Sequence, residues 1–209
     1  MRIAVFGAGG AVGSRVVAEA LARGHEVTAV ARRAVAVPDG VQVRIGDAGS
    51  ADDVEKFSAG QDLVIAATRP AMGRESELPA VAAAMLDGVA RSGVRLLVVG
   101  GAATLMVPGA GVLLHETPDF PTELAAIARA CAEQLAACRA DTEADWAYLS
   151  PPAELIPGER TGSYRVGADE LLVDVAGVST ISMEDFAVAL LDEAERPAHR
   201  RARFTVAAS

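Results

Sequence analysis

The most constraining feature of this sequence is a run of small residues near its start, Gly7-Ala8-Gly9-Gly10-Ala11-Val12-Gly13. The run follows an apolar, β-rich segment, Ile3 to Phe6, and precedes a helical pattern from Ser14 to Arg23. A strand, a glycine turn and a helix in this order are typical of diphosphate binding. The glycines permit the sharp turn, the approach of the backbone to the phosphates and close packing of helix on strand. The first N–H groups of the helix then face the anion.

We therefore predict that the following residues bind a dinucleotide cofactor: Gly7, Ala8, Gly9, Gly10, Ala11, Val12 and Gly13. Their spacing is Gly-x-x-Gly-x-x-Gly, and the stricter Gly-x-Gly-x-x-Gly pattern is not met because residue 12 is Val. The alternative is a structural turn that binds no ligand.

Strand and helix patterns alternate along the rest of the chain. Further strands are predicted at 25–31, 41–45, 62–67, 94–99, 146–150 and 203–206, with helices at 50–58, 78–92, 122–139 and 182–195. This alternation predicts an α/β fold with a Rossmann-type, doubly wound parallel sheet. We expect one NAD(P)-binding domain over residues 1–209, with a cofactor core at 1–150. Residues 151–209 then form a small substrate-side subregion, with strand-like pieces around Leu171 to Val175 and the last helix and strand.

Composition excludes several other classes of protein. The hydrophobic fraction is 51%, yet no apolar run reaches the roughly 18 residues that a membrane span needs. The net charge of −9 argues against a nucleic-acid partner. Because the first residues form a strand and not a secretory leader, we expect a cytoplasmic protein. We also expect it to be monomeric or homodimeric and to act on a small molecule. Cys131 and Cys138 are read as buried thiols, and no metal site is expected because no His/Cys cluster accompanies them.

Arg32 and Arg33 directly follow the second predicted strand. In a dinucleotide fold this strand end faces the adenosine ribose, where a carboxylate binds the 2′-hydroxyl and an arginine accommodates a 2′-phosphate. Two arginines without a carboxylate favour NADP(H) over NAD(H). The alternative is a pair of solvated surface arginines.

Other cofactor contacts are predicted where later strands end. Asp47 follows the third strand and is a candidate acceptor for the adenine amino group, unless it is an ordinary loop carboxylate. Ala67, Thr68 and Arg69 follow at the carboxyl end of the fourth strand, the edge at which ligands bind in open α/β sheets. The irregular stretch that runs to Pro121 after the fifth strand has the length of a lid or substrate loop. Within it, His115 is a candidate proton donor, although a loop histidine is often only solvated.

With these segments in place, the chain resembles the atypical short-chain dehydrogenases/reductases. More narrowly, it is similar to the NAD(P)H-binding branch of NADH-flavin reductases, biliverdin-IXβ reductase and NmrA-like proteins. The most specific matching stretches are Pro-Gly-Glu-Arg-Thr-Gly at 157–162 and Ile-Ser-Met-Glu-Asp-Phe at 181–186. The resemblance implies that the nicotinamide lies between Gly100–Thr104 and Ser150–Pro151, so that Gly100, Gly101, Ser150 and Pro151 bind the cofactor. It also implies a substrate-orienting role for Thr104, which would otherwise be structural.

The chain departs from this superfamily in its proton donor. The catalytic Tyr-x-x-x-Lys pair, in which lysine lowers the tyrosine pKa, is impossible because Lys56 is the only lysine and no tyrosine lies four residues before it. The branch often has Tyr-Lys where this chain has Leu124-Ala125. Tyr148 is read as core packing, and Glu123 as a first-turn helix carboxylate.

A missing acid suggests the class of acceptor. An isoalloxazine or another conjugated acceptor spreads the incoming negative charge and can take its proton from water, so stacking and orientation suffice. We predict NADPH-dependent hydride transfer to a flavin, as a substrate and not a bound cofactor, or to a similar planar molecule. Two alternatives stay open: a non-catalytic NADP(H)-binding redox sensor, and an enzyme of secondary metabolism that acts on a polycyclic intermediate.

Overall fold

The computed structural model describes residues 1–209. Its strands are β1 (Arg2–Phe6), β2 (Glu26–Ala31), β3 (Gln42–Ile45), β4 (Leu63–Ala66), β5 (Arg95–Val99), β6 (Trp146–Ser150), β7 (Glu154–Ile156), β8 (Tyr164–Gly167), β9 (Thr180–Ser182) and β10 (Ala202–Ala208). Its α-helices are α1 (Ala11–Ala22), α2 (Ala51–Ser58), α3 (Leu78–Ser92), α4 (Ala125–Ala140) and α5 (Met183–Glu195). Single 3₁₀ turns lie at Glu75–Glu77, Leu114–Glu116 and Thr122–Leu124.

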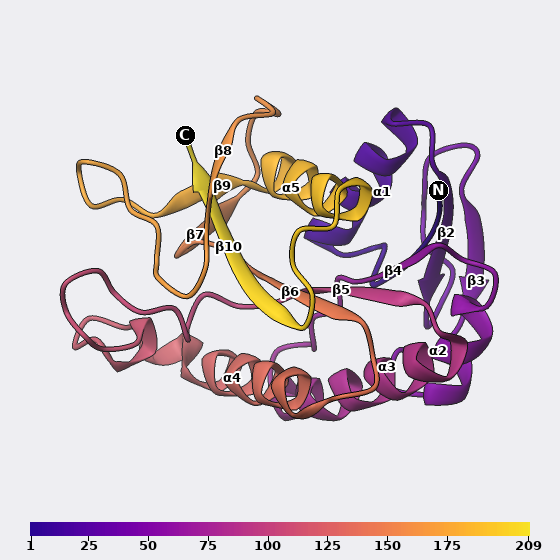
Figure 1. The fold of residues 1–209 in the computed structure, drawn as a ribbon, viewed down its shortest axis with the longest axis horizontal. Coiled ribbons are helices and arrows are strands. Elements are labelled where there is room, and N and C mark those ends of the chain that lie inside the picture. Colours follow the sequence, from indigo (N-terminus) through magenta and orange to yellow (C-terminus); the bar gives the residue numbers. More distant parts are fainter.

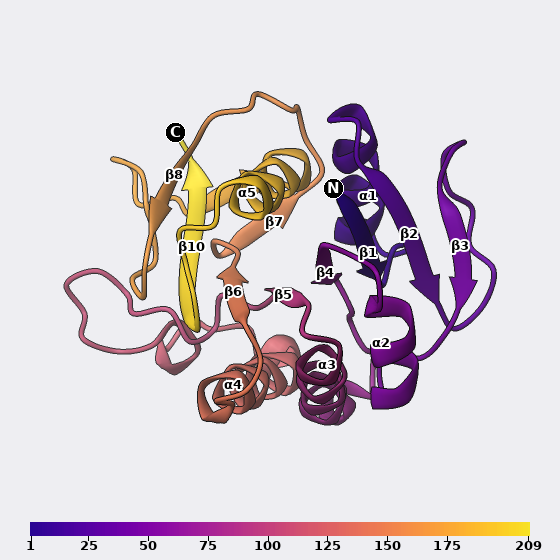
Figure 2. The ribbon, with the colours of Figure 1, turned by 45° about the vertical axis from the view of Figure 1, so that its right-hand side comes forward.

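Eight strands form one sheet in the order β3-β2-β1-β4-β5-β6-β10-β8. All neighbouring pairs are parallel except β8 and β10, which are antiparallel. Helices α1 and α5 cover one face, whereas α2, α3 and α4 cover the other (Figures 1 and 2). The order 3-2-1-4-5-6 is that of a doubly wound Rossmann sheet, which confirms the predicted fold class.

Strand β1 shows why the sheet is buried on both sides. Ile3 and Val5 pack into the core beneath α1 and α5, whereas Ala4 and Phe6 pack into the core shared with α3 and α4. Successive side chains of a strand point to opposite faces, so a strand between two helical layers is apolar throughout. The same holds for β4, all four residues of which are buried. Because the neighbouring strands run parallel, their carboxyl ends lie together at one edge of the sheet.

Helix caps agree with the predicted start signals. The Ser50 side chain accepts a hydrogen bond from the Asp53 N–H at 3.3 Å, and the Ser182 side chain accepts one from the Asp185 N–H at 3.0 Å. Helix α3 ends at Gly93, whose positive φ of 68° permits the left-handed turn that stops the helix.

The region after β6 departs most from the prediction. Leu171 to Val175 does not form a strand; the residues that pair with β10 are those of β8. The apolar pattern at 171–175 arises because Leu171 is a buried anchor whose N–H donates to the Met106 carbonyl at 2.8 Å, whereas Val175 is fully exposed. The short parallel pair of β7 and β9 was not predicted, since three-residue strands carry little periodic signal.

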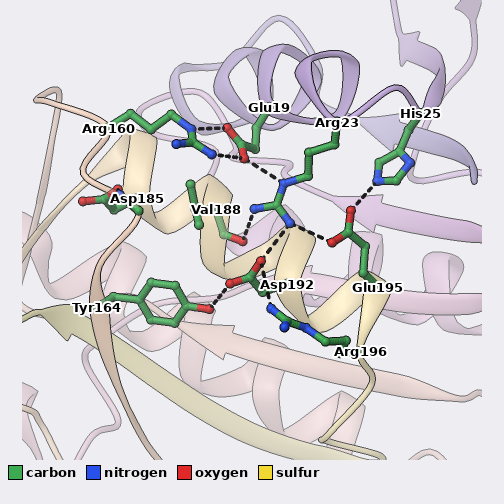
Figure 3. A network of polar contacts seen from close by, with 11 residues as sticks. Glu19, Arg23, His25, Arg160, Tyr164, Asp185, Val188, Asp192, Glu195 and Arg196 are labelled. Atoms are coloured by element: carbon green, nitrogen blue, oxygen red, sulfur yellow. Dashed lines mark hydrogen bonds and ion pairs between the residues drawn. The ribbon is translucent and has the colours of Figure 1, made fainter.

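A network of charged side chains joins this region to α1 and α5 (Figure 3). Arg160, in the loop before β8, bonds to Glu19 of α1, and the Tyr164 hydroxyl donates to Asp192 of α5 at 2.6 Å. The Asp185 carboxylate accepts hydrogen bonds from Thr161 and Gly162. These contacts hold the loop at 157–164 along helices α1 and α5. None of the helices has the length and apolar character needed to cross a membrane.

Candidate cofactor site and active site

The glycine turn between β1 and α1 has the close contacts that only glycine allows. Gly7 has a φ of +82°, and a Cβ on it would lie 2.3 Å from the Ala67 carbonyl oxygen. A Cβ on Gly13 would lie 2.1 Å from the Gly7 carbonyl oxygen. The turn is thus folded tightly against both the helix and the end of β4, as a phosphate-binding turn requires.

The turn presents several unused hydrogen-bond donors. The first helical bond of α1 runs from the Ser14 N–H to the Gly10 carbonyl, and five N–H groups donate to no acceptor in the chain: those of Ala8, Gly9, Ala11, Val12 and Gly13. Helix α1 also has no side-chain cap and no acidic residue in its first turn. By contrast, α2 and α5 both have a serine cap and two first-turn acids. The start of α1 therefore fits a diphosphate, which such N–H groups and the helix dipole attract.

Three arginines lie at the same edge of the sheet without partners. Arg32 and Arg33 follow β2 and Arg69 follows β4, and all three are exposed. None of them forms an ion pair or a hydrogen bond, whereas every other arginine has at least one polar partner. Their positive charges are consequently available to an anionic ligand in a protein of net charge −9.

Asp47, the predicted adenine contact, and Thr68, another predicted cofactor contact, follow β3 and β4 at this edge of the sheet. Asp47 is exposed after β3, where its Oδ1 accepts a hydrogen bond from the Gly49 N–H at 2.9 Å. Its second carboxylate oxygen has no partner in the chain, so it can still accept one from a ligand. Thr68 is half-buried, and its N–H lies 3.0 Å from the position of a Cβ on Gly7, so the 67–69 segment adjoins the glycine turn.

The Gly100-Gly101 segment follows β5 and is packed against Tyr148 of β6. A Cβ on Gly100 would lie 1.9 Å from the Tyr148 ring. The Gly101 N–H donates to the Tyr148 hydroxyl at 3.2 Å, and that hydroxyl lies 3.0 Å from the Gln134 Oε1 of α4. Tyr148 is thus fully buried, in agreement with its interpretation as a core residue.

Cys131 of α4 lies beside the same segment. Its Sγ would be 2.8 Å from a Cβ on Gly101. Burial raises the pKa of the Cys131 thiol to about 11, although the charge of Arg69 opposes the rise. Both cysteines are free; Cys138 is buried as predicted and Cys131 is half-buried. No cluster of metal-ligating side chains occurs in the structure.

The two predicted catalytic residues are each bound within the protein. The Thr104 hydroxyl accepts a hydrogen bond from Arg203 Nη1 at 2.9 Å, and Arg203 also pairs with Asp169. Thr104 faces a cavity of about 630 Å³ whose other lining residues are Met106, Leu113, Ala132, Leu135, Ala136, Arg139, Ala140, Asp169 and Arg203. His115 is half-buried, and its Nδ1 lies 2.7 Å from the carbonyl oxygen of Ala103. Ala103 directly precedes Thr104, so this hydrogen bond holds His115 beside the Thr104 segment.

Ser150 and Pro151 end β6 at the same edge. Both are buried; the Ser150 carbonyl accepts a hydrogen bond from the Thr205 hydroxyl at 2.9 Å, and the Ser150 Oγ has no partner. The structure brings Gly100, Ser150 and Pro151 together through the pairing of β5 with β6. No hydrogen bond joins Ser150 to Thr104 or His115.

The sequence did not indicate two residues that position this site through hydrogen bonds and lie far from their partners along the chain. Arg203 was predicted only as a strand residue, yet it is 99 positions from the Thr104 that it bonds. Gln134 was one residue of a predicted helix, yet it is 14 positions from Tyr148. A buried polar residue within an apolar helix face was the only available signal for Gln134, and Arg203 had none.

The glycine turn, the free N–H groups and the unpaired arginines define a nucleotide-binding Rossmann protein of the short-chain dehydrogenase/reductase type. The chain belongs to the NAD(P)H-binding family, whose model matches residues 7–194. It is an atypical short-chain dehydrogenase/reductase-like, NAD(P)-binding oxidoreductase of the reductase type. The predicted family is therefore confirmed.

Known proteins resemble the chain over its whole length. The Bacillus subtilis protein YwnB is 39% identical over 99% of this chain and 98% of its own. A Streptococcus pneumoniae protein named as a suspected NADH-flavin reductase is 32% identical, with a TM-score of 0.89 over 100% of both chains. A Bacteroides thetaiotaomicron protein named as a suspected epimerase is 38% identical, with a TM-score of 0.90 over 99% of this chain and 96% of that one.

Proposed function

We propose that this protein is an NADPH-dependent reductase that transfers hydride to a flavin or to another planar, conjugated small molecule. The observation that carries the cofactor preference is the pair Arg32 and Arg33, which stands at the end of β2 with no carboxylate partner. An unpaired arginine at this strand end accommodates a 2′-phosphate, whereas NAD(H) needs a carboxylate there. Arg69 lies at the end of β4, next to the glycine turn, and is proposed to bind the pyrophosphate.

The acceptor is inferred from the proton donors that the site offers. The chain has two tyrosines and one lysine. The Tyr148 hydroxyl is buried among Gly101, Gln134 and Cys131, and the Tyr164 hydroxyl donates to Asp192. Lys56 is on α2, with its Nζ 5.1 Å from the centre of the Phe57 ring. No tyrosine–lysine acid therefore stands beside the proposed nicotinamide position, which favours an acceptor that is protonated by water.

The bound nicotinamide supplies the hydride, and the protein supplies orientation. Gly100 and Gly101 lack side chains and therefore lie close against Tyr148 and Cys131. The nicotinamide ring is proposed to lie against the other side of this backbone. Thr104 is proposed to orient the substrate: its hydroxyl accepts from Arg203 and keeps its own hydrogen free to donate. His115 is proposed as an auxiliary proton donor: its Nδ1–H donates to the Ala103 carbonyl, so only the doubly protonated ring carries a proton on Nε2 that it can give to the acceptor.

Stopped-flow spectroscopy of the purified protein tests this proposal. We expect loss of reduced-nicotinamide absorbance when NADPH is mixed with protein and FMN, FAD or a quinone, and a slower reaction with NADH. The Gly13→Ala variant is the matched inactive control, because its added Cβ would meet the Gly7 carbonyl oxygen in the turn.

Three results would redirect or refute the proposal. Tight NADPH binding without oxidation by any acceptor would favour a redox sensor over a reductase. If calorimetry detected no binding of either pyridine nucleotide, the whole proposal would be refuted, because it depends on cofactor binding. Hydride transfer to a polycyclic ketone alone would identify an enzyme with a different acceptor and a dedicated acid.

A further inference from the structure

We propose that Tyr148 is a positioning residue: its hydroxyl fixes the Gly100–Gly101 peptide so that the Gly100 carbonyl oxygen accepts a hydrogen bond from the nicotinamide carboxamide. The inference rests on the proposed function, because it needs a nicotinamide at the carboxyl ends of β5 and β6.

The ring of Tyr148 determines how closely the segment after β5 approaches the sheet. Its Cε1 would lie 1.9 Å from a Cβ on Gly100, so no larger residue can occupy position 100 while the ring stays in place. The ring is fully buried within the core shared with α3 and α4. Gly100 therefore packs directly against a fully buried aromatic ring.

The hydroxyl of Tyr148 then orients the next peptide. It accepts a hydrogen bond from the Gly101 N–H at 3.2 Å, and its own hydrogen is directed to the Gln134 Oε1 at 3.0 Å or the Cys131 carbonyl at 3.3 Å. Burial raises the pKa of Tyr148, so the hydroxyl keeps its proton and both interactions persist at neutral pH. A single phenol thus connects the loop after β5 to helix α4.

This arrangement leaves the Gly100 carbonyl as an open acceptor. The peptide is trans, so the Gly100 carbonyl points opposite to the Gly101 N–H and away from the Tyr148 hydroxyl. The Gly100 N–H donates to the Leu149 carbonyl at 2.9 Å, which is the last ladder bond between the two strands. The next bond of a parallel ladder would come from the N–H of residue 151, but Pro151 has none. No donor of the chain reaches the Gly100 oxygen.

A fixed carbonyl acceptor suits the carboxamide of a nicotinamide. The carboxamide has two N–H donors, whereas the ring beside it has no donor of its own. A hydrogen bond to Gly100 would hold the ring in one orientation and thus determine the face that it presents to the acceptor. Tyr148 acts only through the peptide, without touching the cofactor.

A comparison of two cofactors tests the inference. Calorimetric titration is carried out with NADPH and with its 3-acetylpyridine analogue, in which a methyl group replaces the carboxamide nitrogen. Wild-type protein is expected to bind NADPH about fivefold more tightly than the analogue, the effect of one net hydrogen bond. In Tyr148→Phe, which keeps the ring and removes the hydroxyl, this ratio is expected to fall close to one.

Tyr164→Phe is the matched control, because it removes the chain's other tyrosine hydroxyl, which is bonded to Asp192 in the network of Figure 3. Its cofactor ratio is expected to equal that of the wild type. Equal binding of both cofactors by the wild type, or an unchanged ratio in Tyr148→Phe, would overturn the inference while leaving the proposed function intact. Binding of neither cofactor would overturn both. If Tyr148→Phe does not fold, equal binding of both cofactors by the wild type still overturns the inference.

Discussion

Arg160 and Glu19 form a two-pronged ion pair, with Nε to Oε2 at 2.7 Å and Nη2 to Oε1 at 2.8 Å, although 141 positions separate them in the chain (Figure 3). The Glu19 side chain is only 5% exposed and also accepts a hydrogen bond from Arg23. Glu19 lies on α1, the helix whose first turn presents the free N–H groups. The Pro-Gly-Glu-Arg-Thr-Gly loop is thereby attached to α1.

This pair is expected to make stability depend on acid pH. The hydrogen bonds from Arg160, with further contributions from Arg23, lower the pKa of Glu19 from 4.5 to about 2. The unfolded chain therefore takes up the proton first as pH falls, so the stabilisation is complete above about pH 5 and is lost towards about pH 2. Glu19→Gln is expected to lower the free energy of unfolding by about 2 kcal/mol at neutral pH. Urea titrations at neutral and acid pH measure this, and equal differences between wild type and variant at both pH values would contradict the assignment.

Removal of Arg32 and Arg33 tests the preference for NADPH. In the double alanine variant, the Kd for NADPH is expected to rise by about tenfold or more, since charge-assisted hydrogen bonds to the 2′-phosphate are lost. The Kd for NADH should change little. Arg129→Ala is the control, because Arg129 is a highly exposed arginine on α4 that pairs with Glu133. An equal loss for both cofactors would exclude a 2′-phosphate contact.

Arg69 is expected to behave differently. A contact with the pyrophosphate is common to both cofactors, so Arg69→Ala should raise the Kd for NADPH and NADH alike, by about tenfold. The same calorimetric titrations measure both constants. A fall in kcat with unchanged Kd would instead place Arg69 at the acceptor.

Two glycine-to-alanine substitutions test the glycine turn, and both place an alanine at a positive φ. Gly7 and Gly24 have φ values of +82° and +77°, but only Gly7 has atoms that an added Cβ would meet. Gly24→Ala should therefore lower stability by about 1 kcal/mol, the strain of a left-handed alanine, and leave cofactor binding intact. Gly7→Ala should be more destabilising and abolish NADPH binding, because the Cβ would meet the Ala67 carbonyl. Thermal unfolding and calorimetry separate the effects. Normal NADPH binding by Gly7→Ala would refute the proposal that the glycine turn binds the cofactor.

Much of the fold could be predicted because its signals are local. The apolar strands, the serine caps at Ser50 and Ser182, and the glycine turn each lie within a few residues, and local backbone preferences decide them. The alternation of strand and helix then admits few topologies. Leu171 to Val175 shows the limit: its apolar residues indicated a strand, but burial of one side chain and pairing with Met106 produced an irregular segment.

By itself, the sequence determined the Rossmann architecture, the glycine turn and the position of Arg32 and Arg33 at a strand end, since each follows from a short-range pattern. Only the tertiary structure decided that Tyr148 holds Gly101, that Arg203 holds Thr104 and that Arg160 pairs with Glu19. The physical reason is that a hydrogen bond acts over about 3 Å, and which donor comes that close to which acceptor depends on the register of the whole sheet and the packing of helices upon it.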